Sequence, residues 1–247
     1  MSNYPRIALV DALTPGAPEH YQKLAKSGVK DVIVCLSLSH FDRYRSGECH
    51  TLLAREVGMR THACLVTDLS EPFHDARHFF TAYQKLGYSF GTRVMILCQA
   101  SKNVKNTGQK LTELLGYISY FVSKEDIDVA FNKKDLDRGY FDLDEIPKYF
   151  NLTIINPRQL NSGIDRAGTW ISTKDPDSEV QYLGYDYYGF YTSQGYQLTL
   201  EPEYIAQEGD TWVTIATRHG IWLPKLLELN KADYEDIVVP GQRIKVC

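Results

Sequence analysis

Apolar runs alternate with helical patterns along the first 120 residues. Short stretches rich in Val, Ile and Leu predict strands at residues 7–11, 31–38, 60–67 and 93–98. Apolar residues at helical spacing predict helices at residues 18–28, 49–58, 75–86 and 110–122. Runs such as VIVCL and VMILC are continuously apolar, which is typical of strands covered on both faces. The alternation therefore predicts a parallel sheet with crossover helices, and a (β/α)-barrel is its simplest closure.

The pattern becomes less regular after residue 98. Candidate strands are LTII, TWIS and VQYL, at residues 152–155, 169–172 and 180–183. Residues 124–149 are charged and dotted with Tyr and Phe, and no element is assigned to them. A tyrosine-dense stretch at residues 185–196 follows, near the point where the barrel must close. Its aromatic rings could stack on sugars or fill the core.

A second, complete pattern begins after residues 199–203, where Pro202 punctuates the chain. A short strand at 204–207 leads to a Gly-Asp-Thr turn, whose Asp210 or Thr211 can cap the helix that follows. A second helix is predicted at 223–230, and a closing strand at 243–246. We therefore expect two domains, residues 1–199 and residues 203–247.

The C-terminal pattern resembles the LysM family in the order and spacing of its motif. The matching positions are Tyr204, Ala206, Gly209, Asp210, Thr211, Leu229, Asn230, Val238, Pro240, Gly241, Gln242, Ile244 and Val246. The resemblance implies binding of a glycan that contains N-acetylglucosamine, in practice bacterial peptidoglycan, in a shallow groove between two loops. The implied contacts are Gly209, Asp210, Thr211, Trp212, Asn230, Ile237 and Val238.

Several of these residues also have purely structural interpretations. Gly209 can serve turn geometry alone, and Asp210 fits a helix cap better than a direct ligand. Trp212 stands where the family usually has leucine, so it belongs either to the core or to the sugar-contacting surface.

The N-terminal region resembles the family 25 glycoside hydrolases, which are muramidases built on a (β/α)-barrel. The matching segments are Leu9-Val10-Asp11-Ala12, residues 27–35, residues 57–63, Thr169-Trp170-Ile171 and Gln181-Tyr182. The two resemblances together imply an α/β chain, with a barrel of the family 25 type followed by a small β-α-α-β LysM domain.

Most of the acids expected in such a muramidase are absent. Glycoside hydrolysis needs two carboxyl groups, and the family supplies an Asp-x-Glu at the end of the fourth strand. Leucine or cysteine stands here for the aspartate, and glutamine or alanine for the glutamate, within residues 97–100. Residues 197–200 replace a late aspartate, so only Asp11 survives of the four acids.

Other acids could form a substitute pair with Asp11. Asp68 and Glu71 follow the third strand, at the end where barrels carry their active sites. The favoured interpretation of both, however, is that they cap the helix that begins near Phe73. We interpret Asp186, just after a late strand, as a surface or sugar-contacting residue.

Composition narrows the classes of partner and the place of action. The net charge is −4 and there is no basic run, which argues against a nucleic-acid partner. The first apolar stretch stops at Asp11, too early for a signal peptide or membrane insertion. We therefore expect synthesis in the cytoplasm and action at the bacterial wall, after release or within a virion.

The cysteines and histidines suggest no cofactor. The five cysteines include no CxxC pair, and Cys35, Cys64 and Cys98 lie in apolar runs. We expect them to be reduced core thiols. The histidines of the first 80 residues have no recognised metal-ligand spacing, so no metal site is assigned.

Two functional hypotheses remain. The first is a peptidoglycan-binding protein with a degenerate barrel, acting in a phage tail or baseplate with other tail or wall-associated proteins. The second is an endolysin-type hydrolase that uses Asp11 with Asp68 or Glu71. The loss of three acids favours the first. A single LysM copy also suggests that avidity comes from oligomerisation or a larger assembly.

Overall fold

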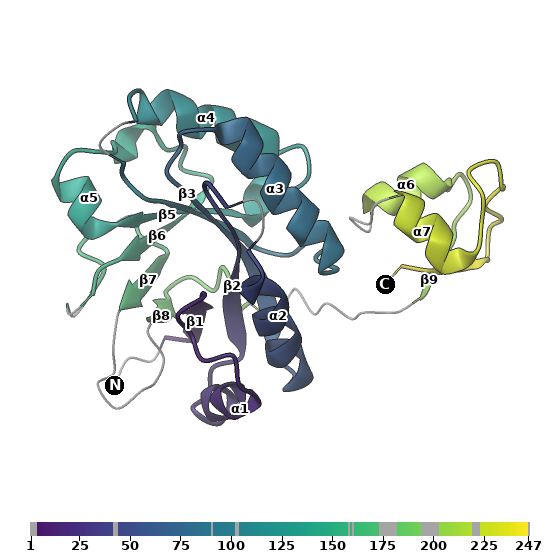
Figure 1. The fold of residues 1–247 in the computed structure, drawn as a ribbon, viewed down its shortest axis with the longest axis horizontal. Coiled ribbons are helices and arrows are strands. Elements are labelled where there is room, and N and C mark those ends of the chain that lie inside the picture. Colours follow the sequence, from purple (N-terminus) through teal and green to yellow (C-terminus); the bar gives the residue numbers. More distant parts are fainter. Residues whose placement is uncertain are drawn as a thin grey trace.

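The computed structural model describes residues 4–41, 44–89, 91–101, 104–157, 159, 161–172, 182–193, 203–218 and 223–246. Within these residues, eight strands close a barrel in chain order (Figure 1). They are β1 (Arg6–Val10), β2 (Asp31–Leu38), β3 (Arg60–Thr67), β4 (Val94–Cys98), β5 (Ile127–Asn132), β6 (Asn151–Ile155), β7 (Thr169–Ser172) and β8 (Tyr182–Asp186). Neighbouring strands from β1 to β7 are parallel, whereas β8 is antiparallel to both β7 and β1.

Helices follow the first four strands and cover the outside of the barrel (Figure 1). They are α1 (Pro18–Lys26), α2 (Ser46–Glu56), α3 (Pro72–Lys85) and α4 (Thr107–Ile118). These helices confirm the predicted elements, with ends shifted by a few residues. A five-residue helix, α5 (Lys133–Asp137), follows β5, and short 3₁₀ turns lie at Lys124–Asp126 and Leu143–Glu145.

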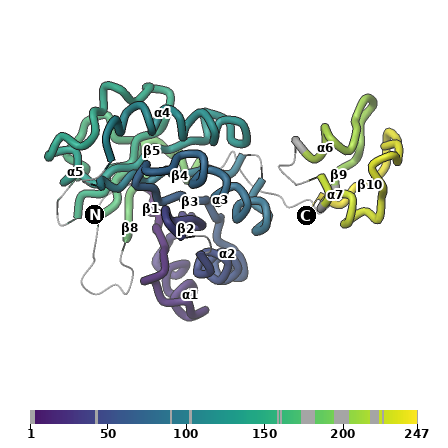
Figure 2. The backbone as a smooth tube through the Cα atoms, turned by 45° about the horizontal axis from the view of Figure 1, so that its top comes forward, coloured from purple at the N-terminus to yellow at the C-terminus, as the bar shows by residue number. Residues whose placement is uncertain are grey.

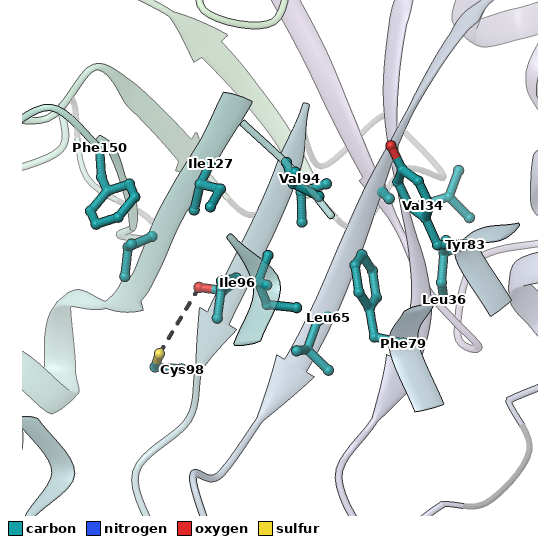
Figure 3. Packing of buried hydrophobic residues seen from close by; sticks show 14 of the residues in the cluster. Val34, Leu36, Leu65, Phe79, Tyr83, Val94, Ile96, Cys98, Ile127 and Phe150 are labelled. Atoms are coloured by element: carbon teal, nitrogen blue, oxygen red, sulfur yellow. Dashed lines mark hydrogen bonds between the residues drawn. The ribbon is translucent and has the colours of Figure 1, made fainter. Parts of the chain in front are cut away.

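The strands bury side chains on both faces, which explains their continuous apolar runs. Along β4, Val94 and Ile96 pack outward beneath the helices, together with Phe79 of α3 (Figure 3). Met95 and Leu97 point into the barrel and join its separate interior cluster. The period-2 alternation of a strand therefore feeds two cores at once.

The predicted core thiols are confirmed. Cys35 and Cys64 lie inside the barrel, Cys98 faces the helices, and all three are buried and free. Burial raises the pKa of the Cys35 thiol to about 12, so this thiol stays protonated at neutral pH.

Strand β5 is the element that the sequence pattern missed. Assigning no element to residues 124–149 was wrong, because residues Ile127–Asn132 pair with β4 and β6. The polar Asp128 interrupts the apolar run, yet its carboxylate is buried and accepts hydrogen bonds from Thr153 and Asn151. The strand predicted at residues 180–183 corresponds to β8, which is described from Tyr182 to Asp186. Residues 180–181 lie outside the described part.

The C-terminal strands and helices lie close together (Figure 2), and their side chains form a core of their own. Strands β9 (Glu203–Ile205) and β10 (Arg243–Lys245) pair antiparallel, and helices α6 (Trp212–Arg218) and α7 (Leu223–Asn230) lie between them in sequence. Buried side chains from both helices, the closing strand and the adjoining loops meet there: Ala206, Trp212, Ile215, Ala216, Leu226, Val238 and Ile244. The predicted β-α-α-β order is confirmed.

Candidate functional site

The rim at the carboxyl ends of the parallel strands is the first candidate site, because barrels of this type carry their active sites there. On β4, Met95 and Leu97 face the interior and Cys98 faces the helices. The same alternation directs the next inward position to Gln99, which is exposed. Leu97 and Gln99 are therefore the inward-facing pair at the end of β4, in the stretch where the family's Asp-x-Glu is expected.

Asp11 lies on this rim, directly after β1. Its Oδ1 accepts a hydrogen bond from the Leu13 amide at 2.9 Å and a longer one from Thr14 Oγ1 at 3.4 Å. Tyr182 lies close by: burial raises the pKa of this phenol, and the Asp11 carboxylate raises it further. Asp11 is thus a partly buried carboxylate beside an aromatic ring.

Asp68 forms a separate cluster after β3. Its Oδ2 lies 2.9 Å from His40 Nε2, and its Oδ1 accepts hydrogen bonds from the amide and hydroxyl of Ser70. Burial opposes the charged form of Asp68, but the bonds from Ser70 and His40 lower its pKa. The hydrogen bond to Asp68 in turn raises the pKa of His40.

The expectation that Asp68 and Glu71 cap a helix was wrong. Glu71 occupies the N-cap position of α3, but its side chain makes no capping hydrogen bond. Asp68 instead bonds to Ser70 and His40. Asp11 bonds to Leu13 and Thr14, whereas Asp68 bonds to His40 and Ser70. The two carboxylates therefore share no hydrogen-bonding partner among the described residues, and Glu71 is exposed.

A buried carboxylate fixes the loops that carry the Asp68 cluster. Asp75 accepts hydrogen bonds from Ser39 Oγ at 2.6 Å and Thr67 Oγ1 at 2.7 Å, which ties the loops after β2 and β3 to α3. The neighbouring His40 and Leu69 have φ angles of 68° and 62°, a conformation that costs free energy outside glycine. Surrounding bonds therefore hold the His40–Asp68 geometry in place.

The tyrosine-dense stretch lies at the opposite end of the barrel. Because β8 runs antiparallel, the residues after Asp186 lie at the amino ends of the other strands. Asp186 is fully buried and accepts hydrogen bonds from the amides of Phe190, Tyr191 and Thr192. Its interpretation as a surface or sugar-contacting residue was wrong, since it holds a turn that closes the barrel.

Tyr191 belongs to the barrel core. It is buried, and its hydroxyl donates a hydrogen bond to Asp128. Residues 194–196 of the stretch lie outside the described part of the chain. The described residues of this stretch therefore offer no stacking surface at the rim.

Asp128 is expected to make barrel stability depend on pH. Burial raises the pKa of this carboxyl from 3.8 to about 6, although Thr153, Tyr191 and Asn151 donate hydrogen bonds to it. Because the pKa of Asp128 is higher in the folded protein, its protonated form stabilises the barrel. This stabilisation is complete below about pH 4 and is lost as the pH rises through about 6. The difference is on the order of 3 kcal/mol.

The Asp128→Asn substitution removes this titration. Relative to wild type, the variant should lack the fall in unfolding free energy between about pH 4 and pH 7. Urea denaturation across that range measures the difference. Equal pH dependence in both proteins would contradict the assignment.

The second candidate site is a groove in the C-terminal domain, with a volume of about 470 Å³. It is lined by Trp212, Asn230, Lys231, Ala232, Asp236, Ile237, Val239 and Gln242. The groove brings together three of the seven predicted contacts, Trp212, Asn230 and Ile237. Gly209, Asp210, Thr211 and Val238 are not among its lining residues.

Several predicted contacts have structural roles instead. Asp210 Oδ2 accepts hydrogen bonds from the Tyr204 hydroxyl and the Gln207 amide, so it holds the turn before α6. Thr211 is the residue that caps α6, accepting from the Thr214 amide at 3.1 Å. Val238 is buried in the core, and Gly209 has a φ of +85° that favours glycine in this turn.

Trp212 and Asn230 set the shape of the groove. The Trp212 ring is buried, and its Nε1 donates to the Asp236 carbonyl at 2.9 Å. Asn230 bonds to the amide and carbonyl of Lys245 on β10, each at 2.8 Å. These two side chains fix the loop between α7 and β10, and Ile237 is left exposed on it.

Five further residues line the groove: Lys231, Ala232 and Asp236, which belong to the second of the two loops that the resemblance implied (about residues 230–238), and Val239 and Gln242, which lie beyond it. Gln242 is part of the family string, and its Oε1 accepts from the Val239 amide at 3.0 Å. Its place in the motif was the available signal for a position at the groove.

Neither a metal cluster nor a membrane span occurs among the described residues. No group of three or more His, Cys, Asp or Glu there could hold a metal ion. Within the same ranges, each helix is too short or too polar to traverse a bilayer.

Known proteins resemble the two parts separately. The family model of the LysM domain matches residues 204–246. No curated protein matches the chain. An endolysin catalytic domain from a bacteriophage of Listeria monocytogenes superposes with a TM-score of 0.63 at 12% identity, covering 77% of this chain and 97% of that one.

Two further solved structures share the barrel. A family 25 glycosyl hydrolase from Bacillus anthracis has a TM-score of 0.62 at 13% identity, over 76% of this chain and 91% of its own. A muramidase from Trichobolus zukalii has a TM-score of 0.60 at 10% identity, over 73% and 92%. The chain therefore carries a LysM domain at residues 204–246 and a barrel with the fold of the family 25 glycosyl hydrolases.

Proposed function

We propose that this protein binds bacterial peptidoglycan through its LysM groove, and that its muramidase-like barrel does not hydrolyse glycan. The observation that carries the proposal is the pair Leu97 and Gln99 at the rim. Leucine has no ionisable group, and glutamine keeps the shape of glutamate but cannot act as a general acid. Wall binding is then the principal activity of the chain.

The glycan groove and the likeness to wall-active proteins support this proposal. An autolysin of Streptococcus pneumoniae, whose structure was solved with a synthetic peptidoglycan ligand, shares the barrel fold at 11% identity, although the chain covers only 46% of it. A wall-docking role in a phage tail or baseplate, with neighbouring tail proteins as partners, fits a single weak glycan module.

The alternative is a peptidoglycan hydrolase with a rearranged acid pair. The observation that favours it is the Asp68–His40 pair, a carboxylate and an imidazole 2.9 Å apart on the same rim as Asp11. A protonated His40 could donate a proton to a leaving group, with Asp11 as the second charge. Glu71 is exposed beside this cluster and could replace Asp68.

Lysis and binding are measured on the same purified walls. We expect no fall in turbidity with the wild-type chain, together with sedimentation of the chain with the walls. Lysis that disappears in Asp11→Asn or Asp68→Asn, but persists in Asp165→Asn, would establish the hydrolase. Asp165 is the matched control because it is an exposed carboxylate in the segment leading into β7.

A further inference from the structure

A second groove lies on the outer wall of the barrel, between α4 and the segment that leads into β6. Its volume is about 440 Å³. Its lining includes Leu115 of α4, together with Tyr120, Lys124, Glu145, Tyr149 and Phe150. Lys124 precedes β5 and Tyr149 precedes β6, so this side groove opens toward the end of the barrel opposite the rim.

Two tyrosines of the side groove are largely exposed. Tyr120 is 83% exposed and Tyr149 is 57% exposed, although Ile118 and Phe150, close to them in sequence, are buried. Both rings border the hollow, so a ligand in the side groove would meet them. A pyranose ring presents a face of C–H groups that stacks on such rings, and its hydroxyls find polar partners at the edge.

The wall that carries Tyr149 is firmly anchored. Its neighbours Ile146 and Phe150 are buried. The guanidinium of Arg166 donates hydrogen bonds to the carbonyls of Leu143 at 3.1 Å and Pro147 at 2.8 Å. A ligand would therefore meet a surface that is already ordered, which lowers the entropic cost of binding.

The side groove carries one cation, Lys124, and one carboxylate, Glu145, among its described lining residues. The Lys124 ammonium lies 5.8 Å from the centre of the Tyr149 ring. The Glu145 carboxylate packs on the first turn of α4, where a Cβ on Gly108 would lie 1.8 Å from its Oε2. The positive end of that helix offsets its charge, so Lys124 is the cation placed beside the aromatic platform.

We propose that this side groove is a second binding site for peptidoglycan glycan. A sugar ring stacks on Tyr149 and Tyr120, and a carboxylate of the muramyl peptide pairs with Lys124. The identity of the ligand rests on the function proposed above. A second contact on the same chain raises avidity beyond that of the LysM groove alone.

The test titrates a soluble N-acetylglucosaminyl-N-acetylmuramyl tetrapeptide into the full-length chain by calorimetry. Wild type should bind at two sites. The Y120A/Y149A variant should bind at one, and Ile237→Asp in the LysM groove should keep the other. Affinity for the side groove, measured in the Ile237→Asp background, should fall roughly tenfold when both tyrosines are removed.

Two controls separate stacking from other effects. Tyr149→Phe keeps the ring and should retain binding. Tyr188→Ala removes a tyrosine that is 76% exposed outside the side groove and should have no effect. Sedimentation velocity shows whether the variants alter self-association.

One binding site in wild type, abolished by Ile237→Asp, would overturn the proposal. So would a change in self-association without a change in glycan binding, because the occupant would then be a second copy of the chain. If binding were unchanged in Ile237→Asp and lost on adding Y120A/Y149A, the proposed glycan binding by the LysM groove would be wrong. The proposed site in the side groove would then be supported.

Discussion

Replacing Asp186 with alanine is expected to lower the unfolding free energy of the barrel by about 3–5 kcal/mol. The carboxylate is fully buried and accepts four hydrogen bonds, from three backbone amides and the Thr192 hydroxyl. Alanine leaves the amides of Phe190, Tyr191 and Thr192 without this acceptor. The turn that carries Tyr191 into the core then loses its support, and urea denaturation measures the loss.

Two variants define the cause. Asp186→Asn keeps one carbonyl acceptor and should lose less than half as much stability. Asp165→Ala removes an exposed carboxylate and should change stability by less than about 0.5 kcal/mol. If Asp186→Ala were as mild as Asp165→Ala, the turn would not depend on these hydrogen bonds.

The first four strand–helix units could be predicted because their strands are apolar on both faces. Val94 and Ile96 serve the outer core while Met95 and Leu97 serve the interior, so the whole run is apolar. Strand β5 escaped prediction because Asp128 faces the interior. Its donors, Asn151, Thr153 and Tyr191, lie 23 to 63 residues away in sequence.

The direction of β8, like the role of Asp128, depends on contacts far apart in sequence and could not be predicted from the local pattern. The sequence placed Asp186 after a late strand, but only the pairing with β1 and β7 shows that this strand is antiparallel. That reversal moves the tyrosine-dense stretch to the end away from the rim. Conversely, the LysM motif predicted Trp212, Asn230 and Ile237 at the groove because its turns and loops are local in sequence.

The Ile237→Asp substitution is expected to reduce wall binding through the LysM groove by more than roughly tenfold. Ile237 is 85% exposed and lies in the groove with Trp212 and Val239. An exposed apolar side chain at this position has no part in the domain core, so it is available to a ligand. An aspartate there places a hydrated charge where the N-acetyl group and sugar face would pack. Co-sedimentation with purified walls, as a function of wall concentration, measures the change.

The matched control is Val213→Asp on α6. Val213 is 48% exposed but does not line the groove, so the same charge change there should leave wall binding intact. Equal binding by the two variants would place the glycan elsewhere. Because Ile237 is so exposed, its substitution should leave thermal unfolding of the domain unchanged, whereas Trp212→Ala removes a buried ring and should unfold it. A loss of binding without a loss of folding therefore separates recognition at the groove from the integrity of the core beneath it.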